Sequence, residues 1–383
     1  MDFSLTPEQQ RIQTLARGFA QQEVAPLAHD ADESRVFPMA LVRRMGELGF
    51  LGATFGREYG GSALDHVSYC LALEELGRVD SSVRGFLTVH AGLVAGCIAA
   101  WGSEEQKQRY LPRMASGELI GCYCLTEPEA GSDAASIQTT AREEGDDYVL
   151  KGQKIWITNG NIAGIAIVFA NRDYTQRHRG ICAFLVEPET PGFDREKMGG
   201  SELGHRASDH AHIRLRDCRV PASALLGEAG QGFKIAMSAL DRGRLGVAAG
   251  AVGVGQACLD ACVAFARERR QFGKRIGDFE MIQATLADMA ADVEAARLLV
   301  YQAAWLMDQG RSATKAASIA KLFATEAAAR AASEAVLLHG NRGYSNEFPV
   351  ERYYRDIKGL QIYEGTSHIQ RLIIARELLG RDE

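Results

Sequence analysis

The sequence predicts an α+β protein in which a strand-built middle domain separates two helical blocks. Apolar residues recur at three- and four-residue steps in the first and last parts of the chain, which is typical of helices. The part between them contains short runs of β-branched and aromatic residues separated by Gly, Asn, Asp and Pro, which is typical of strands. These patterns predict an N-terminal helical domain over residues 1–122, a middle β-domain over 123–230 and a C-terminal four-helix bundle over 231–383.

The N-terminal domain opens with a helix-start signal. Thr6 offers an N-cap hydroxyl, Pro7 suits the first helical position, and Gln9 completes a capping box. Apolar residues then follow at near-helical spacing: Ile12, Leu15, Phe19 and Val24.

The middle domain carries a series of candidate strands. They cover residues 148–150, 154–158, 165–169, 181–186 and 212–216. The last of these runs alternates apolar and polar residues, as a half-buried strand does. From Gly232 onward the sequence returns to Ala- and Leu-rich helical stretches of about 25 residues, a length that suits a four-helix bundle.

Composition narrows the class of protein. The chain has 383 residues, 46% of them hydrophobic, 24% charged, and a net charge of −6. These values are typical of a globular protein, and no dense Lys/Arg face indicates nucleic-acid binding. The N-terminus lacks a signal pattern, and charges interrupt every long apolar run, so we expect no membrane insertion.

The eight cysteines show no zinc-type pairing. Cys122 and Cys124 are too close for that pattern, and Cys258 and Cys262 have no partner pair nearby. We expect no metal site, and we interpret the cysteines as reduced, mostly buried thiols of a cytoplasmic enzyme.

Two segments far apart in the sequence carry the candidate chemistry. Near the C-terminus, Glu364 lies between a tyrosine and Gly365. More than two hundred residues upstream, the segment 124–133 joins a strand-like run to a Gly-Ser turn. Together they resemble the two signature regions of the acyl-CoA dehydrogenase family, flavoenzymes that desaturate acyl thioesters. The resemblance covers essentially the whole chain and includes the helix–strand–helix order.

Glu364 is the candidate catalytic base. Removing a proton α to a thioester carbonyl needs a carboxylate in a dry pocket, and Ile362 and Tyr363 are expected to supply apolar surroundings. Taken alone, Glu364 would be an ordinary capping or surface glutamate. In the resemblance it is the base, and Tyr363 and Gly365 line the substrate. One branch of the family carries its base on another helix, but the equivalent position here is Gly243, which has no carboxylate.

The resemblance implies FAD as the cofactor. Thr126 would bind the flavin pyrimidine edge, Ser132 the pyrophosphate, Trp156 would stack on the ring, and Thr158 would approach its N5 atom. Thr366, after the base, belongs to the same cofactor set. Without the resemblance, the Gly-Ser turn would be an ordinary turn and Trp156 would be core packing.

The resemblance also implies that a second subunit contributes to the cofactor site. Arg269 and Phe272 resemble residues that reach the FAD of a neighbouring subunit, so the resemblance implies a homotetramer built as a dimer of dimers. Asp241 and Arg244 match residues that contact the pantetheine and thioester arm. A basic helix end facing solvent is the alternative for Arg269. Departures from the family pattern are expected to alter adenosine binding: Leu337, Asn341 and His368.

The segment around Arg84 leads to a prediction about the substrate. The segment 77–87 resembles glutaryl-CoA dehydrogenases, in which an arginine grips the distal carboxylate, although Gly77 replaces an acidic residue there. We therefore expect Arg84 to favour a short, polar or acidic acyl tail. The alternative is that Arg84 pairs with a local carboxylate such as Asp80.

The sequence thus predicts an FAD-dependent enzyme that converts an acyl-CoA thioester to the trans-2-enoyl thioester. Glu364 would remove the α-proton, flavin N5 would accept the β-hydride, and electrons would leave through an electron-transferring flavoprotein. Alternatives are a dehydrogenase of carrier-protein-bound acyl thioesters, a glutaryl-CoA-type dehydrogenase and an oxidase of the same fold. A non-catalytic oligomeric scaffold is the alternative from another class.

Overall fold

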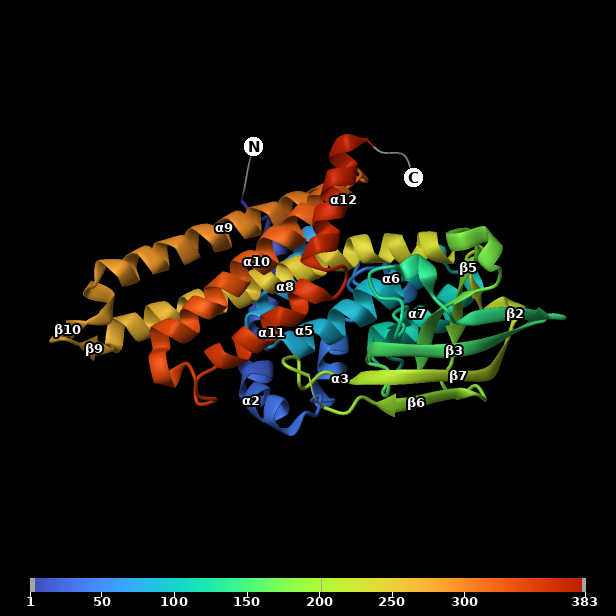
Figure 1. The fold of residues 1–383 in the computed structure, drawn as a ribbon, viewed down its shortest axis with the longest axis horizontal. Coiled ribbons are helices and arrows are strands. Elements are labelled where there is room, and N and C mark those ends of the chain that lie inside the picture. The colour runs from blue at the N-terminus through green and yellow to red at the C-terminus, as the bar shows by residue number, and fades with distance from the viewer. Residues whose placement is uncertain (1–3, 201, 381–383) are drawn as a thin grey trace.

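The computed structural model describes residues 4–200 and 202–380 of the chain. Figure 1 shows a sheet at one end of an elongated molecule and long helices that extend to the other end. The predicted order of helices, strands and helices is confirmed.

The N-terminal part is helical. Its helices are α1 (Pro7–Phe19), α2 (Ala25–Ser34), α3 (Ala40–Glu47), α4 (His66–Gly77), α5 (Ser81–Leu87), α6 (Gly96–Trp101) and α7 (Glu104–Ser116). Two π-helical turns, Ala20–Val24 and Thr88–Ala95, join neighbouring helices. The predicted capping box is confirmed, because Thr6 Oγ1 accepts from Gln9 N at 3.2 Å and Thr6 N donates to Gln9 Oε1 at 3.0 Å.

The middle part is one sheet. Its strands are β1 (Gly121–Cys124), β2 (Thr140–Glu144), β3 (Asp147–Thr158), β4 (Ile165–Asn171), β5 (Ile181–Val186), β6 (Phe193–Lys197), β7 (His210–Pro221) and β8 (Leu225–Leu226). The order is β6-β7-β3-β2-β4-β5-β8, with β1 parallel beside β4. The two runs expected at 148–150 and 154–158 form a single strand, β3, which pairs with β7 through two register shifts.

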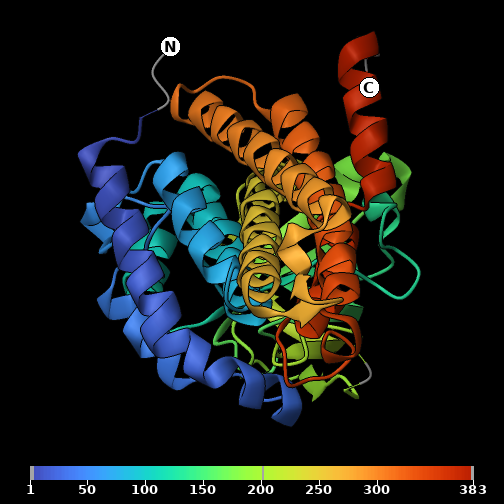
Figure 2. The same ribbon diagram turned by 90° about the vertical axis from the view of Figure 1, so that its left-hand side faces the viewer.

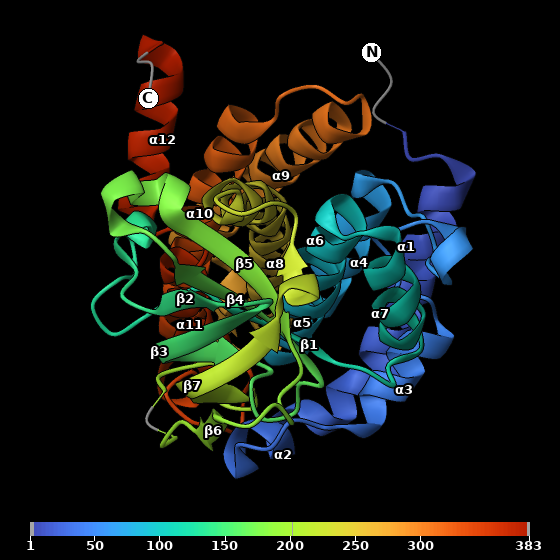
Figure 3. The same cartoon turned by 90° about the vertical axis from the view of Figure 1, so that its right-hand side faces the viewer.

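The C-terminal part consists of α8 (Gly232–Glu268), α9 (Glu280–Asp308), α10 (Thr314–His339), α11 (Val350–Ile362) and α12 (Ser367–Leu379). A short hairpin, β9 (Arg270–Gln271) and β10 (Lys274–Arg275), joins α8 to α9. With 37 residues α8 is longer than expected, because no proline interrupts its Ala- and Gly-rich sequence. Seen from the sheet end, the strands lie in front of α8, α10 and α11, with the N-terminal helices beside them (Figure 3).

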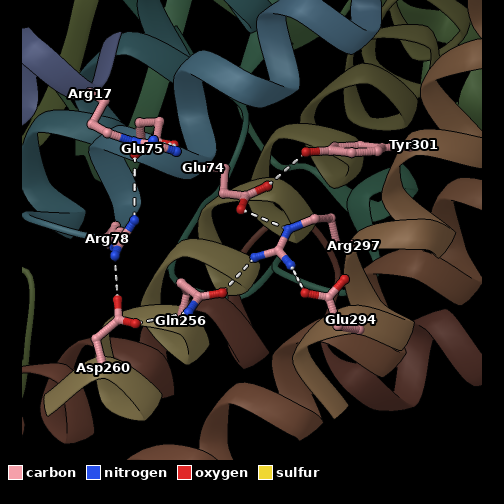
Figure 4. Close-up of polar contacts among 9 residues, drawn as sticks. All are labelled: Arg17, Glu74, Glu75, Arg78, Gln256, Asp260, Glu294, Arg297 and Tyr301. Atoms are coloured by element: carbon pink, nitrogen blue, oxygen red, sulfur yellow. Dashed lines mark hydrogen bonds and ion pairs between the residues drawn. The ribbon is translucent and has the colours of Figure 1, made fainter. Parts of the chain in front are cut away.

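A buried polar network ties the N-terminal helices to the C-terminal bundle (Figure 4). Glu74 and Glu75 on α4 are both buried, and they accept hydrogen bonds from arginines on opposite sides of α4. Arg297 of α9 donates to Glu74 Oε1 at 3.0 Å, and Arg17 of α1 donates to Glu75 Oε1 at 2.7 Å. In the end view of Figure 2 the N-terminal helices lie along one flank of the bundle, which is the face that this network joins.

Two helical stretches are long and apolar enough to cross a membrane by length and composition. They cover Ser81–Trp101 and Gly232–Glu268, and their most apolar windows are 78% and 67% buried inside the fold. Such burial is typical of core helices in a globular protein. All eight cysteines are free and buried. Within the described ranges no group of three His, Cys, Asp or Glu residues could hold a metal ion.

Candidate active site

Glu364 lies in the turn between α11 and α12. Its φ is 55° and that of Gly365 is 91°, so two successive residues adopt the left-handed conformation. A non-glycine residue held there costs about 1–2 kcal/mol, and such residues gather at functional sites. Thr366 then begins α12, its Oγ1 accepting from Ile369 N at 3.3 Å. The chain is therefore bent sharply at the predicted base.

The carboxyl group of Glu364 points against α8. Its Oε2 atom is buried and has no hydrogen-bond partner among the described residues, although the residue as a whole is partly exposed. A Cβ atom placed on Gly243 would lie 1.9 Å from Oε2 and 2.9 Å from Leu93. Burial raises the pKa of Glu364 to about 7, against the opposing effects of Arg84, Lys321 and Arg244.

The expected shielding by Ile362 is wrong. Ile362 is 63% exposed, because it ends α11 on the outer face of that helix. The carboxyl is covered by α8 instead, a contact that local sequence does not reveal.

Unpaired polar atoms gather around this carboxyl. Most buried polar groups in proteins find a partner, so a local excess without one marks a place that a polar ligand can complete. In the described part of the chain the unpaired buried atoms near Glu364 include Tyr69 Oη, Arg84 Nε, Arg244 Nε and Gln370 Oε1. They come from α4, α5, α8 and α12, which places the site where these elements meet.

Arg84 is almost completely buried, with 1% of its surface exposed. Its guanidinium donates to the Tyr363 hydroxyl and, at 3.4 Å, to Thr88 Oγ1. The alternative pairing with Asp80 is not formed, because Asp80 caps α5 and accepts from Val83 N at 2.7 Å. In the part of the chain that the structure describes, no carboxylate lies within ion-pair distance of Arg84, although its charge lowers the pKa of Glu364.

Asp241 and Arg244 lie on the turn of α8 that contains Gly243. They form an ion pair with each other, and Thr314 Oγ1 donates to Asp241 Oδ2 at 2.9 Å. Arg244 is buried, and burial lowers its pKa against the opposing charges of Asp241 and Glu364. Both predicted thioester-arm residues are therefore next to the candidate base.

The predicted flavin loop is anchored by a buried ion pair. Lys154 of β3 lies 2.6 Å from Glu127 Oε1, and both side chains are buried. Glu127 also accepts from Thr139 N at 3.0 Å, while Ile155 N donates to Thr126 O at 2.9 Å. These contacts hold Thr126 against β3 and leave the loop tip with Ser132 exposed.

Trp156 is not a core residue. It sits at a register shift of β3 with φ 58°, and its side chain is 51% exposed. Its ring meets that of His210 edge-on, with centroids 5.9 Å apart, and His210 pairs with Thr158 across the strands. A half-exposed indole beside two accessible hydroxyls, those of Thr126 and Thr158, fits the planar ring of an FAD.

Asn159 links the flavin side to the substrate side, a role that sequence reasoning did not assign. Its backbone N–H donates to Asp209 O at 2.7 Å, and its buried side chain donates to Gly121 O at 3.3 Å and to Phe86 O at 3.4 Å. Phe86 belongs to α5, two residues beyond Arg84. The end of β3 is thereby fixed to the helix that carries Arg84.

Arg269 and Phe272 are not brought to this site within one chain. Arg269 ends α8, and Phe272 lies in the β9–β10 hairpin with φ 48° and 92% exposure. That hairpin lies at the end of the molecule opposite the sheet (Figure 1). Leu337 is likewise exposed near the end of α10, and His368 is exposed on the first turn of α12.

Two further residues at the base escaped the sequence analysis. Lys321 on α10 donates to Tyr363 O at 3.0 Å and to Gly365 O, and Gln370 donates to Gly365 O at 2.9 Å. The available signal was the position of Lys321 within the alanine-rich apolar stripe of a predicted helix, where a charged residue needs a partner.

Comparison with known proteins shows the family of the chain. The chain matches the N-terminal domain of acyl-CoA dehydrogenases over residues 6–118, the middle domain over 122–218 and the C-terminal domain over 230–379. It is 47% identical to a probable acyl-CoA dehydrogenase of Bacillus subtilis, covering 99% of this chain and 100% of the relative. It is 46% identical to the mitochondrial short-chain specific acyl-CoA dehydrogenase of Mus musculus, covering 97% and 90%.

Solved structures agree as well. Butyryl-CoA dehydrogenase from Megasphaera elsdenii has a TM-score of 0.96 at 42% identity, covering 99% of this chain and 100% of that one. A glutaryl-coenzyme A dehydrogenase in complex with glutaryl-CoA has a TM-score of 0.96 at 40% identity, covering 99% and 97%. A chain solved in a structural study of the electron transferring flavoprotein of Acidaminococcus fermentans has a TM-score of 0.97 at 45% identity, with complete coverage of both chains. The chain therefore belongs to the acyl-CoA dehydrogenase family, and it is an FAD-dependent oxidoreductase that acts on acyl-CoA thioesters.

Proposed function

We propose that Glu364 is the base that removes the α-proton of the acyl thioester and that the product is a trans-2-enoyl thioester. The observation that carries this role is the buried Oε2 atom, which has no partner among the described residues and faces the site. A pKa of about 7 suits a base that works near neutral pH, because it combines basicity with a large unprotonated fraction. The Glu364 N–H, which has no acceptor in the described ranges, would stabilise charge on the thioester oxygen.

The cofactor would be held by residues of the sheet and of the base turn. Thr126 and Ser132 would take the polar edge and the pyrophosphate, Trp156 and Thr158 would lie against the ring, and Thr366 would contact it from the start of α12. Bound FAD supplies the acceptor for the β-hydrogen of the substrate. The residues of this chain keep the ring next to the substrate and exclude water from Glu364.

The preferred substrate is an acyl thioester with a short, polar or acidic tail. Support comes from the buried Arg84 guanidinium, which has an unpaired Nε atom and no carboxylate partner in the described residues. A charge buried in this way is stabilised when an anion joins it, whereas a long aliphatic tail would leave it unpaired. The relatives named for short acyl groups and for glutaryl-CoA favour the same range of substrates.

Arg84→Ala is expected to reduce kcat/KM for glutaryl-CoA at least tenfold more than for butyryl-CoA, because only the former would lose a charge-assisted contact of about 1.5–3 kcal/mol. The measurement is anaerobic bleaching of the flavin absorbance against a panel of short, long, branched and dicarboxylic acyl-CoAs. Arg330→Ala, at an exposed ion pair with Asp292, is the control. Equal losses for both substrates would contradict the pocket role. Reaction with an acylated carrier protein but with no acyl-CoA would favour the carrier-protein alternative.

The working protein is proposed to be a cytoplasmic homotetramer that passes electrons to an electron-transferring flavoprotein. The β9–β10 hairpin supports the assembly, because it holds the 92% exposed Phe272 at the end of the molecule opposite the sheet, so Phe272 could meet a flavin only in another subunit. Phe272→Asp is expected to dissociate the assembly and to release FAD. Sedimentation velocity with absorbance at flavin wavelengths would read both effects, and a variant that stays assembled and yellow would contradict this role.

A further inference from the structure

Lys321 carries a buried charge for which the family resemblance predicted no role. It lies in the N-terminal half of α10 with none of its surface exposed. No Asp or Glu oxygen in the described residues lies within ion-pair distance of its Nζ atom. Its hydrogen bonds go instead to two backbone carbonyls, that of Tyr363 at 3.0 Å and that of Gly365. Burying an ammonium group is costly without partners, so the two carbonyls that flank Glu364 are what hold this charge in the core.

Gln370 completes the set of carbonyl contacts. Its Nε2 atom donates to Glu364 O at 3.3 Å and to Gly365 O at 2.9 Å. All three carbonyls from Tyr363 to Gly365 are therefore turned toward Lys321 and Gln370. Gln370 is itself fully buried, so this arrangement is fixed by the interior and not by a surface loop.

The orientation of these carbonyls determines that of the neighbouring N–H groups. In a trans peptide unit the C=O and the following N–H point in opposite directions, so the bond from Lys321 to Tyr363 O turns the Glu364 N–H away from α10. In the described part of the chain, the N–H groups of Glu364, Gly365 and Thr366 have no acceptor. The left-handed φ angles of Glu364 and Gly365 form the sharp turn that leaves these N–H groups on the side away from Lys321 and Gln370.

We propose that Lys321 is a positioning residue that aims the Glu364 N–H at the thioester oxygen and keeps the Glu364 carboxyl beside α8. It acts through the backbone on both sides of the base, and Gln370 shares the task from α12. The inference rests on the proposed role of Glu364 as the base.

The charge of Lys321 also affects the pKa of Glu364, and this effect can be measured. The charged groups that face Glu364 are Lys321 from α10, Arg244 from α8 and Arg84 from α5, while Glu326 of α10 also faces Lys321. Lys321 opposes the effect of burial and holds the pKa of Glu364 down. Removing the ammonium therefore raises the pKa of Glu364 further above its usual range.

The test is Lys321→Met, which keeps the length of the side chain and removes its charge. We expect kcat to fall about a hundredfold with KM changed less than about threefold, because the base and the oxyanion donor lose their alignment. The acid limb of the kcat/KM profile is expected to move to higher pH. The rate at which the substrate α-proton exchanges with D₂O is expected to fall in parallel with kcat.

Lys315→Met is the matched control, since Lys315 is exposed on the same helix. A Lys321→Met enzyme with near-normal kcat and an unmoved acid limb would overturn the proposal. If that variant does not fold, Gln370→Leu gives the same readouts for the shared task, and an unchanged kcat there overturns it. Glu364→Gln separates the two hypotheses: an active Glu364→Gln enzyme removes the base assignment, whereas an inactive one beside a normal Lys321→Met removes only the positioning role.

Discussion

Glu364→Gln is expected to lower kcat by roughly 10³- to 10⁴-fold, the upper range for the loss of a general base. The amide has almost the same size as the carboxyl, so the turn and its contacts with Lys321 and Gln370 stay in place. It cannot accept the α-proton at neutral pH, because an amide oxygen is far less basic than a carboxylate with a pKa of about 7. Stopped-flow bleaching of the flavin by butyryl-CoA, without oxygen, measures the step directly.

The control is Glu377→Gln on the exposed face of α12, which changes the same net charge away from the site. It should bleach at the rate of the parent enzyme. The Glu364→Gln protein should remain yellow and should bind acyl-CoA, since no cofactor contact is removed. A Glu364→Gln rate within a factor of ten of the parent would mean that another group takes the proton.

The segments proposed to carry the chemistry stand out in the sequence because each is short and contiguous. Within each segment the residues are only a few positions apart: Glu364 with Gly365, the loop from Thr126 to Ser132, and Trp156 with Thr158. Periodicity also separated helices from strands, because an alanine- and leucine-rich run and a β-branched run differ over the length of a single element. Trp156 adopts an unusual positive φ, and its proposed role was indicated by the motif around it and not by its strand propensity.

What escaped prediction depends on packing between distant elements. Lys321 lies 43 residues before Glu364, and only the crossing of α10 with the base turn brings its ammonium to the Tyr363 carbonyl. Asn159 reaches α5 across 73 positions. Ile362 was expected to cover the base, but the face of α11 on which it falls is decided by how that helix packs, which local sequence does not specify.

The contact between Gly243 and Glu364 gives the second large effect. In the sequence Gly243 is merely a position without a carboxylate. In the structure the carboxyl of Glu364, the proposed base, occupies the space that a side chain at position 243 would fill. Gly243→Ala is expected to lower kcat by roughly 10²-fold or more, because a methyl group 1.9 Å from Oε2 would force the carboxyl out of its productive position. The change is measured as the rate of flavin bleaching, together with the melting temperature.

Helix propensity makes this variant informative. Replacing glycine by alanine inside a helix stabilises it by about 1 kcal/mol when space allows, but at Gly243 the new methyl would also lie 2.9 Å from Leu93. A loss of activity with an unchanged melting temperature therefore reports the displaced carboxyl and not a weaker α8. Gly18→Ala is the matched control, because a Cβ there meets no atom within 4 Å and the chain continues helically from α1 into the turn Ala20–Val24. It should raise the melting temperature and leave bleaching unchanged. If Gly243→Ala also keeps its full rate, the carboxyl of Glu364 does not need the place beside α8, and the geometry proposed for the base is wrong.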